Sequence, residues 1–102
     1  MQDLHLPPWP YPTLREVSPK VKEVDLQWNH YLRNGLGVTF LAVTQWSELA
    51  AKLSSEKKHF KRRLNVIKKL SDNAEEREQC HWLGLYMDRQ VVTFLHNAQR
   101  FF

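Results

Sequence analysis

The sequence predicts an all-α domain of about four helices, with a proline-rich extended arm at its N-terminus and a long C-terminal helix. Two observations predict this fold: apolar side chains recur at three- and four-residue steps over most of the chain, and residues that start helices precede these runs. A chain of 102 residues with 42% hydrophobic residues can bury one cooperative core but not two. We therefore expect a single helical domain over residues 18–102.

The first segment, Met1 to Pro12, is too rich in proline to form a helix or a central strand. Proline fixes φ and lacks the backbone N–H, and four prolines here surround two aromatic residues, Trp9 and Tyr11. We predict an extended arm over residues 1–17. Its aromatic side chains either contact nothing or pack on the domain or on a partner, and the sequence leaves both alternatives open.

The first helix is predicted to begin at Ser18-Pro19 and to run to about Arg33. Serine can cap a free backbone N–H, and proline at the first helical position loses nothing. Asn34-Gly35 provides a left-handed stop. The apolar stripe of this helix consists of Val21, Val24, Trp28, Tyr31 and Leu32.

Residues 36–53 allow two interpretations, because the apolar and partly β-branched run over residues 38–43 is also typical of a buried strand. We favour a helix, since Thr39 can cap it and the Ala- and Leu-rich sequence that follows keeps helical spacing. We expect a break near Thr44.

A third helix is predicted from Glu56 to about Leu70. Ser54-Ser55 is a typical helix-start signal, and Glu56 suits the positive end of a helix dipole. Asp72-Asn73 then offers a cap and Glu75-Glu76 an acidic first turn for the last helix.

The last helix is apolar around more of its circumference than one core contact needs, which is typical of a central helix or of one at a subunit interface. Gly84 can bend or split it. Its surplus apolar surface and the aromatic arm predict an interface for self-association or a partner helix, comprising Trp9, Tyr11, Val91, Phe94, Leu95, Phe101 and Phe102.

The positive charge of the chain is concentrated in the third helix and the residues just before it. Eight of the fifteen Lys and Arg residues stand between Lys52 and Leu70, against Glu56 alone. At 100° per residue, this helix has one apolar face and one basic face. The apolar face holds Phe60, Leu64, Ile67 and Leu70, and the basic face holds Lys58, Lys61, Arg62, Asn65 and Lys69. We predict one core that buries Trp28, Phe60, Leu64, Ile67, Leu83 and Met87.

A row of cations on the exposed face of a helix, opposite its buried face, is typical of a helix that lies in a DNA groove or along phosphates. Arg62 and Asn65 can contact bases, because arginine pairs with guanine and asparagine with adenine. The predicted DNA-binding set is Lys57, Lys58, Lys61, Arg62, Arg63, Asn65, Lys68 and Lys69. The alternative is an ordinary solvated lysine face, which the near absence of interleaved carboxylates disfavours.

The sequence offers no recognisable catalytic constellation, so we expect a protein that is not an enzyme and that binds no cofactor or metal. Cys80-His81 point about 100° apart on a helix, and a second cysteine for a structural zinc set is missing. Cys80 lies on an apolar stripe, which favours a core residue over a nucleophile. A single cysteine suits a reducing compartment, and the sequence predicts neither a membrane span nor a signal peptide.

The stretch from about Val21 to Asp88 resembles the DNA-binding domain of fungal transcription activators of the glycolytic-gene regulator and high-osmolarity-response type. The resemblance is carried by Trp28, Tyr31, Gly35-Leu36, Trp46, Phe60-Lys61-Arg62-Arg63, Val66-Ile67 and Leu70. That family usually has a Trp-Arg pair before the basic helix, whereas Ser47 follows Trp46 here. The resemblance implies a nuclear, sequence-specific DNA-binding module with Lys61, Arg62 and Arg63 at the matching basic positions.

We therefore expect a sequence-specific DNA-binding domain of a nuclear transcription regulator, which docks its basic helix on double-stranded DNA. The alternative is a helical protein-interaction or dimerisation module without enzymatic activity, and RNA binding is a further alternative. No membrane partner is expected.

Overall fold

The computed structural model describes residues 17–102, except for the side chains of residues 36–38. The described part contains helices and no strand, which confirms the all-α prediction and the helical interpretation of residues 38–42. Residues 1–16 of the predicted arm, which include Trp9 and Tyr11, lie outside the described residues, and its last residue, Val17, is partly buried against the core. In chain order the elements are α1 (Pro19–His30), the π-helical turn η1 (Tyr31–Gly35), α2 (Leu36–Ala42), α3 (Trp46–Leu70), α4 (Ala74–Ala98) and the 3-10 turn η2 (Gln99–Phe101).

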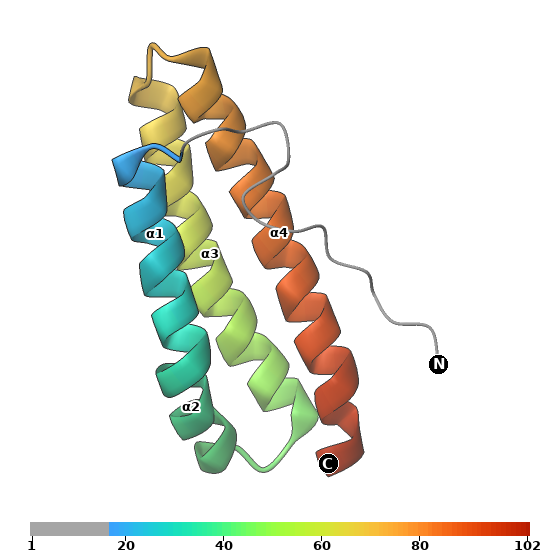
Figure 1. The fold of residues 1–102 in the computed structure, drawn as a ribbon. Coiled ribbons are helices and arrows are strands. Elements are labelled where there is room, and N and C mark those ends of the chain that lie inside the picture. The colour runs from blue at the N-terminus through green and yellow to red at the C-terminus, as the bar shows by residue number, and fades with distance from the viewer. Residues whose placement is uncertain (1–16) are drawn as a thin grey trace.

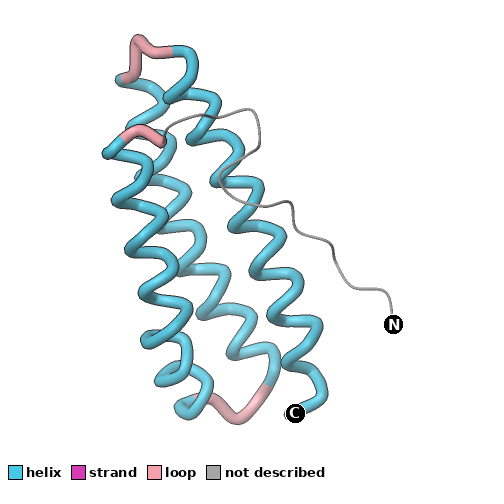
Figure 2. The backbone as a smooth tube through the Cα atoms, viewed as in Figure 1, coloured by secondary structure: helices cyan, strands magenta, loops and turns pink. Residues whose placement is uncertain are grey.

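The helices form an elongated bundle that measures 45 × 28 × 18 Å (Figure 1). α1, η1 and α2 follow one another along one side, and α3 and α4 form an antiparallel hairpin beside them. Two short connections, residues 43–45 and 71–73, reverse the chain at opposite ends of the bundle (Figure 2). Within residues 17–102, every helix is too short or too polar to cross a lipid bilayer.

Two predicted boundaries are confirmed by the structure. The helical structure is interrupted at residues 43–45, which include the predicted break at Thr44. α3 then starts with a capping box between Gln45 and Glu48. At the start of α4 the Asn73 side chain accepts hydrogen bonds from the backbone N–H groups of Glu75 (2.8 Å) and Glu76 (3.2 Å). Both carboxylates stand in the first turn of α4, where they suit the helix dipole.

The predicted helix start at residues 54–56 is wrong, because α3 runs unbroken from Trp46 to Leu70. Ser54 and Ser55 are exposed, and solvated serines cost an uninterrupted helix only a few tenths of a kcal/mol to roughly 0.7 kcal/mol each. Gly84 neither bends nor splits the last helix, since α4 is continuous from Ala74 to Ala98.

The predicted left-handed stop at Asn34-Gly35 is also wrong. Gly35 has φ −72°, an ordinary right-handed value, and the chain widens into the π-helical turn η1 and continues into α2. A Cβ at this position would stand 2.7 Å from the Tyr31 ring. The absence of a side chain at Gly35 therefore lets the aromatic ring one turn earlier pack closely against the backbone. Thr39 does not cap α2 either: its hydroxyl donates to the Gly35 carbonyl (3.2 Å), within the helix.

Ser18 precedes Pro19 as expected but does not cap α1 with its side chain. Its hydroxyl instead donates to the Glu76 carboxylate, and its backbone N–H donates to Gln79 Oε1 (2.7 Å). The Gln79 side chain is almost fully buried there. These bonds fasten the start of α1 to the first turns of α4.

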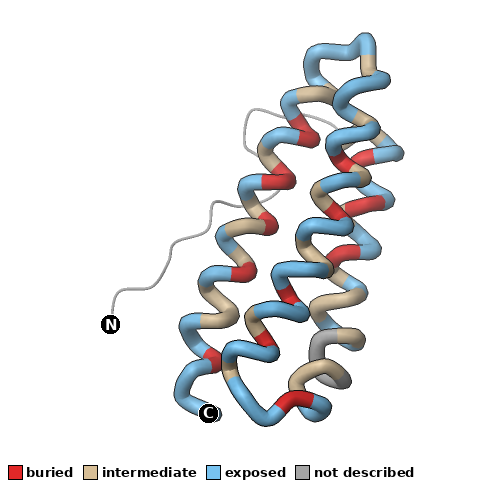
Figure 3. The backbone as a smooth tube through the Cα atoms, turned by 180° about the vertical axis from the view of Figure 1, so that it is seen from behind, coloured by how far each residue is buried: buried red, intermediate tan, exposed pale blue. Residues whose placement is uncertain are grey.

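One core runs along the bundle axis (Figure 3). At its centre Trp28 is fully buried, its indole N–H donates to Gln90 Oε1 (2.8 Å), and its ring meets Phe60 edge to face at 5.4 Å. The predicted core is confirmed for Trp28, Phe60, Leu64, Leu83 and Met87, and Ile67 is partly buried against it.

Leu70 departs from the prediction, because 81% of it is exposed. It belongs to the last turn of α3, which projects beyond the start of α1 (Figure 1). The helical wheel places Leu70 on the apolar face correctly, but no helix covers that face at this level.

Candidate functional site

Four polar residues of α3 form a continuous exposed row on the side of the helix that faces away from the core. They follow one another at steps of four, three and four residues, so their side chains project in nearly the same direction. We call this row, Lys58, Arg62, Asn65 and Lys69, the outer strip. At 1.5 Å per residue it is about 16 Å long. No carboxylate among residues 17–102 lies within ion-pair distance of its three cations.

Two of the predicted cations form ion pairs with a carboxylate from the neighbouring helix. Asp88 of α4 accepts from Lys61 Nζ at 2.8 Å and from Lys57 Nζ at 3.1 Å. The lysine side chains are 25% and 37% exposed for Lys57 and Lys61, and Asp88 is 34% exposed. Lys57 and Lys61 therefore lie beside the outer strip, with their charges directed toward α4.

Burial alone would raise the pKa of Asp88, but hydrogen bonds and charge from Lys61 and Lys57 outweigh it and hold this pKa below its usual value. The carboxylate is ionised at neutral pH and offsets half of the charge of the two lysines. Gly84 lies beside this contact, because a Cβ there would stand 3.4 Å from Lys61 Cε. At that distance a methyl group would be in ordinary van der Waals contact with the flexible lysine stem.

The other two predicted cations point to opposite flanks of α3. Arg63 is half-buried toward α1, where its guanidinium donates to Gln27 Oε1 and lies 5.7 Å from the Phe60 ring centre. Lys68 is exposed on the α4 side. Of the eight predicted residues, the structure thus brings four together: Lys58, Arg62, Asn65 and Lys69. Lys68 is exposed nearby. Lys57 and Lys61 contact Asp88, and Arg63 contacts Gln27.

A shallow surface depression of about 500 Å³ lies beside Lys58, Arg62 and Asn65 of the outer strip; Lys57 and Lys61 line it as well, and Lys69 does not. Its lining comes from α3 alone and includes Ser54, one turn before Lys58. Hydroxyl, amide and cationic donors are the groups that proteins use to contact phosphate oxygens. The depression therefore carries the kinds of donor that contact an anionic backbone.

No family model, curated protein or solved structure matches the chain. The resemblance to the fungal activators thus stays a prediction that depends on the residues quoted above. Its three matching basic positions are divided by the structure: Arg62 is exposed on the outer strip, whereas Lys61 and Arg63 contact α4 and α1.

The predicted interface on the last helix needs one correction. Val91 is 3% exposed and packs in the core, so a partner cannot reach it. Phe94 and Leu95 are partly buried against the same core. Among the predicted interface residues that the structure describes, Phe101 and Phe102 are the exposed ones, at 68% and 45% exposure.

Cys80 is a core residue, as its place on the apolar stripe predicts. Burial, with a smaller contribution from Glu76, raises the pKa of its thiol to about 11. The thiol therefore stays protonated at neutral pH, which makes it a poor nucleophile. Within residues 17–102, no three side chains of the metal-ligating types gather in one place.

Proposed function

We propose that this protein binds double-stranded DNA through the outer strip of α3. The observation that carries the proposal is the alignment of Lys58, Arg62 and Lys69 on one exposed face, without a carboxylate partner in the described chain. Unpaired cations keep their full attraction for phosphates, because no internal ion pair has to be broken first.

The shape of α3 supports the same proposal. It is a single helix of 25 residues, and an α-helix fits the major groove of B-form DNA. The outer strip, about 16 Å long, covers roughly half of the 34 Å helical repeat of the duplex. The opposite side of α3 is anchored by Phe60 and Leu64 in the core, so a bound duplex would meet a rigid surface.

Within the outer strip the residues divide by chemistry. Arg62 and Asn65 present fixed donor geometries that match base edges, whereas lysine is a mobile point charge suited to phosphate. We assign base contacts to Arg62 and Asn65 and phosphate contacts to Lys58 and Lys69. Sequence specificity then comes from the middle of the outer strip and general affinity from its ends.

The first test is a titration of the full chain against a random duplex at about 50 and 200 mM salt, followed by fluorescence anisotropy. Binding that weakens steeply with salt is expected. The absence of binding even at low salt would overturn the proposal, because attraction to phosphates is the least that such a surface must provide.

The second test compares alanine variants on a preferred site selected from a random duplex library. Arg62→Ala and Asn65→Ala are expected to weaken the preferred site by ~1–3 kcal/mol and the random duplex less. Lys58→Ala and Lys69→Ala are expected to weaken both duplexes alike and to reduce the salt slope by roughly one unit each. Lys20→Ala, an exposed lysine of α1, is the matched control. Equal behaviour of all five variants would contradict the assignment.

A further inference from the structure

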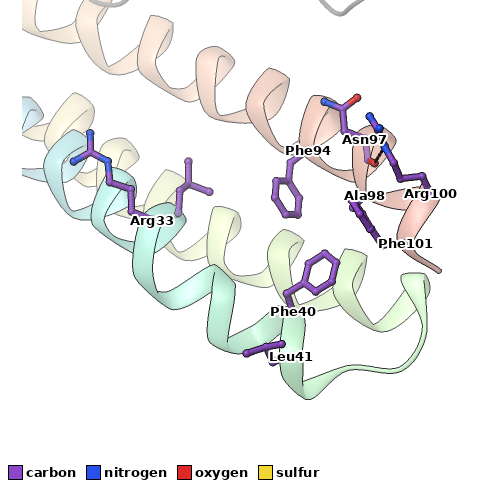
Figure 4. Close-up of a pocket in the computed structure, with 9 residues that line it drawn as sticks. Arg33, Phe40, Leu41, Phe94, Asn97, Ala98, Arg100 and Phe101 are labelled. Atoms are coloured by element: carbon purple, nitrogen blue, oxygen red, sulfur yellow. Dashed lines mark hydrogen bonds between the residues drawn. The ribbon is translucent and has the colours of Figure 1, made fainter.

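A second concave surface lies at the other end of the bundle from the α3–α4 connection, between η1–α2 and the C-terminal part of α4 (Figure 4). This pocket has a volume of about 710 Å³. Its floor is formed by Leu32, Phe40, Phe94 and Phe101, and Arg33 and Arg100 stand at its rim. We call it the aromatic pocket. No residue of α3 lines it, so it is separate from the outer strip.

The floor of the aromatic pocket leaves much apolar surface in contact with water. Phe40 meets Phe101 edge to face at 6.1 Å and lies 5.3 Å from the Phe102 ring centre, yet Phe101 remains 68% exposed. Leu41 beside them is 89% exposed. Contiguous apolar surface of this kind in a concave site is typical of a surface that binds a partner.

The rim of the aromatic pocket is positive at both ends. Figure 4 shows the side chains of Arg33 and Arg100 at opposite ends of the group of phenylalanines. The Arg100 guanidinium lies 5.8 Å from the Phe101 ring centre, and its Nε–H donates to the Asn97 carbonyl (3.3 Å). Among residues 17–102, no carboxylate forms an ion pair with either arginine.

We propose that the aromatic pocket binds an acidic, apolar peptide segment of another protein. Bulky apolar side chains of the segment enter between the phenylalanines, and its carboxylates pair with Arg33 and Arg100 at the two ends. Arginine forms bidentate contacts with carboxylates, which fixes the orientation of the segment as well as adding affinity.

The rim charges also decide against a second copy of this chain as the occupant. A two-fold symmetric contact brings the same surface of both copies together. Here it would place four arginine side chains against one another without a described carboxylate between them. Nucleic acid fits less well than a peptide, because the pocket offers only two cations around an apolar floor.

The experiment uses a phage-display library of random twelve-residue peptides, selected on the full chain. Binders to the Arg33→Glu/Arg100→Glu variant are removed in each round. We expect enriched sequences with net negative charge and at least two bulky apolar residues. Enrichment of basic sequences, or no enrichment, would overturn the proposal.

One enriched peptide is then labelled and titrated by fluorescence anisotropy. We expect Arg33→Glu/Arg100→Glu and Phe101→Ser each to weaken binding by about tenfold or more, which corresponds to about 1.4 kcal/mol. All three substituted residues are exposed, so the bundle is expected to stay folded. The matched control Lys20→Glu/Lys22→Glu makes the same charge change on α1 and is expected to stay within about twofold of the unmodified chain.

Two further outcomes identify the wrong occupant. A dimer in sedimentation analysis that Phe101→Ser dissociates would show that a second copy covers the pocket. Displacement of the labelled peptide by single-stranded oligothymidylate, undiminished in Lys58→Ala/Arg62→Ala, would show that the pocket takes nucleic acid. Either result overturns the proposal. The inference does not rest on the function of α3, so failure of DNA binding at the outer strip leaves it standing.

Discussion

Replacing Asp88 with asparagine tests whether the two lysines that it binds can be returned to the proposed DNA-binding surface. The carboxylate binds Lys61 at 2.8 Å and Lys57 at 3.1 Å, beside the outer strip. Asp88→Asn keeps the size of the side chain and removes its charge. Two cations then become available to phosphates, and one anion that repels phosphates disappears.

The magnitude follows from the number of cations released. Each additional phosphate contact steepens the dependence of log K on log salt by about 0.9. Two contacts therefore add about 1.8 units. Between about 1 M and about 0.1 M salt, the same relation raises the binding constant by up to roughly eightfold for each added phosphate contact. We expect Asp88→Asn to bind a random duplex about eight- to sixtyfold more tightly, depending on whether one or both lysines engage.

The assay is fluorescence anisotropy of a random duplex between about 50 and 200 mM salt. Glu78→Gln is the control, because this exposed residue of α4 gives the same change in net charge away from the lysine pair. Equal tightening by both variants would show only an effect of net charge. Unchanged affinity and slope in Asp88→Asn would refute the reasoning that Asp88 withholds Lys57 and Lys61 from DNA.

The same contact gives stability a defined pH dependence. Because the pKa of folded Asp88 is held below its ordinary value, the carboxylate contributes stability that is present above about pH 4 and lost as pH falls through the lowered pKa. The contribution is below about 1 kcal/mol, since the groups are about a third exposed and screened by solvent. Urea unfolding of Asp88→Asn is expected to lack this part of the acid sensitivity.

Three further predictions concern the core. Leu64→Ala is expected to cost ~2–5 kcal/mol in urea unfolding and Leu70→Ala below about 0.5 kcal/mol, because the side chains are 2% and 81% exposed; similar losses would contradict this packing. Gly84→Ala is expected to stabilise the protein by ~0.5–1 kcal/mol, since alanine favours the helix and its Cβ meets only the flexible Lys61 stem; destabilisation would show that the helices are closer there. Cys80 is expected to react with a maleimide at pH 7 far more slowly in the native chain than in urea, and equal rates would place the thiol outside the core.

The sequence predicted well wherever a local rule decides the structure. Asn73 caps α4 because its short side chain reaches the next free N–H groups. The spacing of Phe60 and Leu64 on the basic helix was enough to identify the buried side of α3. The outer strip follows from the same periodicity, since it lies opposite these residues.

The predictions failed where the side chains packed around a residue override its local signal. Ser18 looks like a helix cap, but its hydroxyl binds Glu76 in a helix far along the sequence. Gly35 looks like a left-handed stop, but its lack of a side chain makes room for Tyr31. Lys57 and Lys61 were predicted in the DNA-binding set, and their engagement by Asp88 has the same origin as the Ser18 contact. Their partner Asp88 belongs to the next helix, and only the packing of α3 against α4 brings the charges together.

The three-residue connection between α3 and α4 also bears on how fast and in what order the chain folds. Contacts across the α3–α4 hairpin span 27 residues at Lys61–Asp88 and 49 at Trp46–Leu95 and become shorter toward the connection, so closing them costs less loop entropy than closing contacts of longer separation. α1 is joined to α4 by bonds of long sequence separation, 61 residues for Ser18 to Gln79 and 62 for Trp28 to Gln90. We expect the hairpin to be largely formed at the rate-limiting step and α1 to dock afterwards. Substitutions at Leu53 or Leu83 are then expected to slow refolding, whereas Val24→Ala mainly speeds unfolding, and the reverse pattern in stopped-flow kinetics would contradict this order.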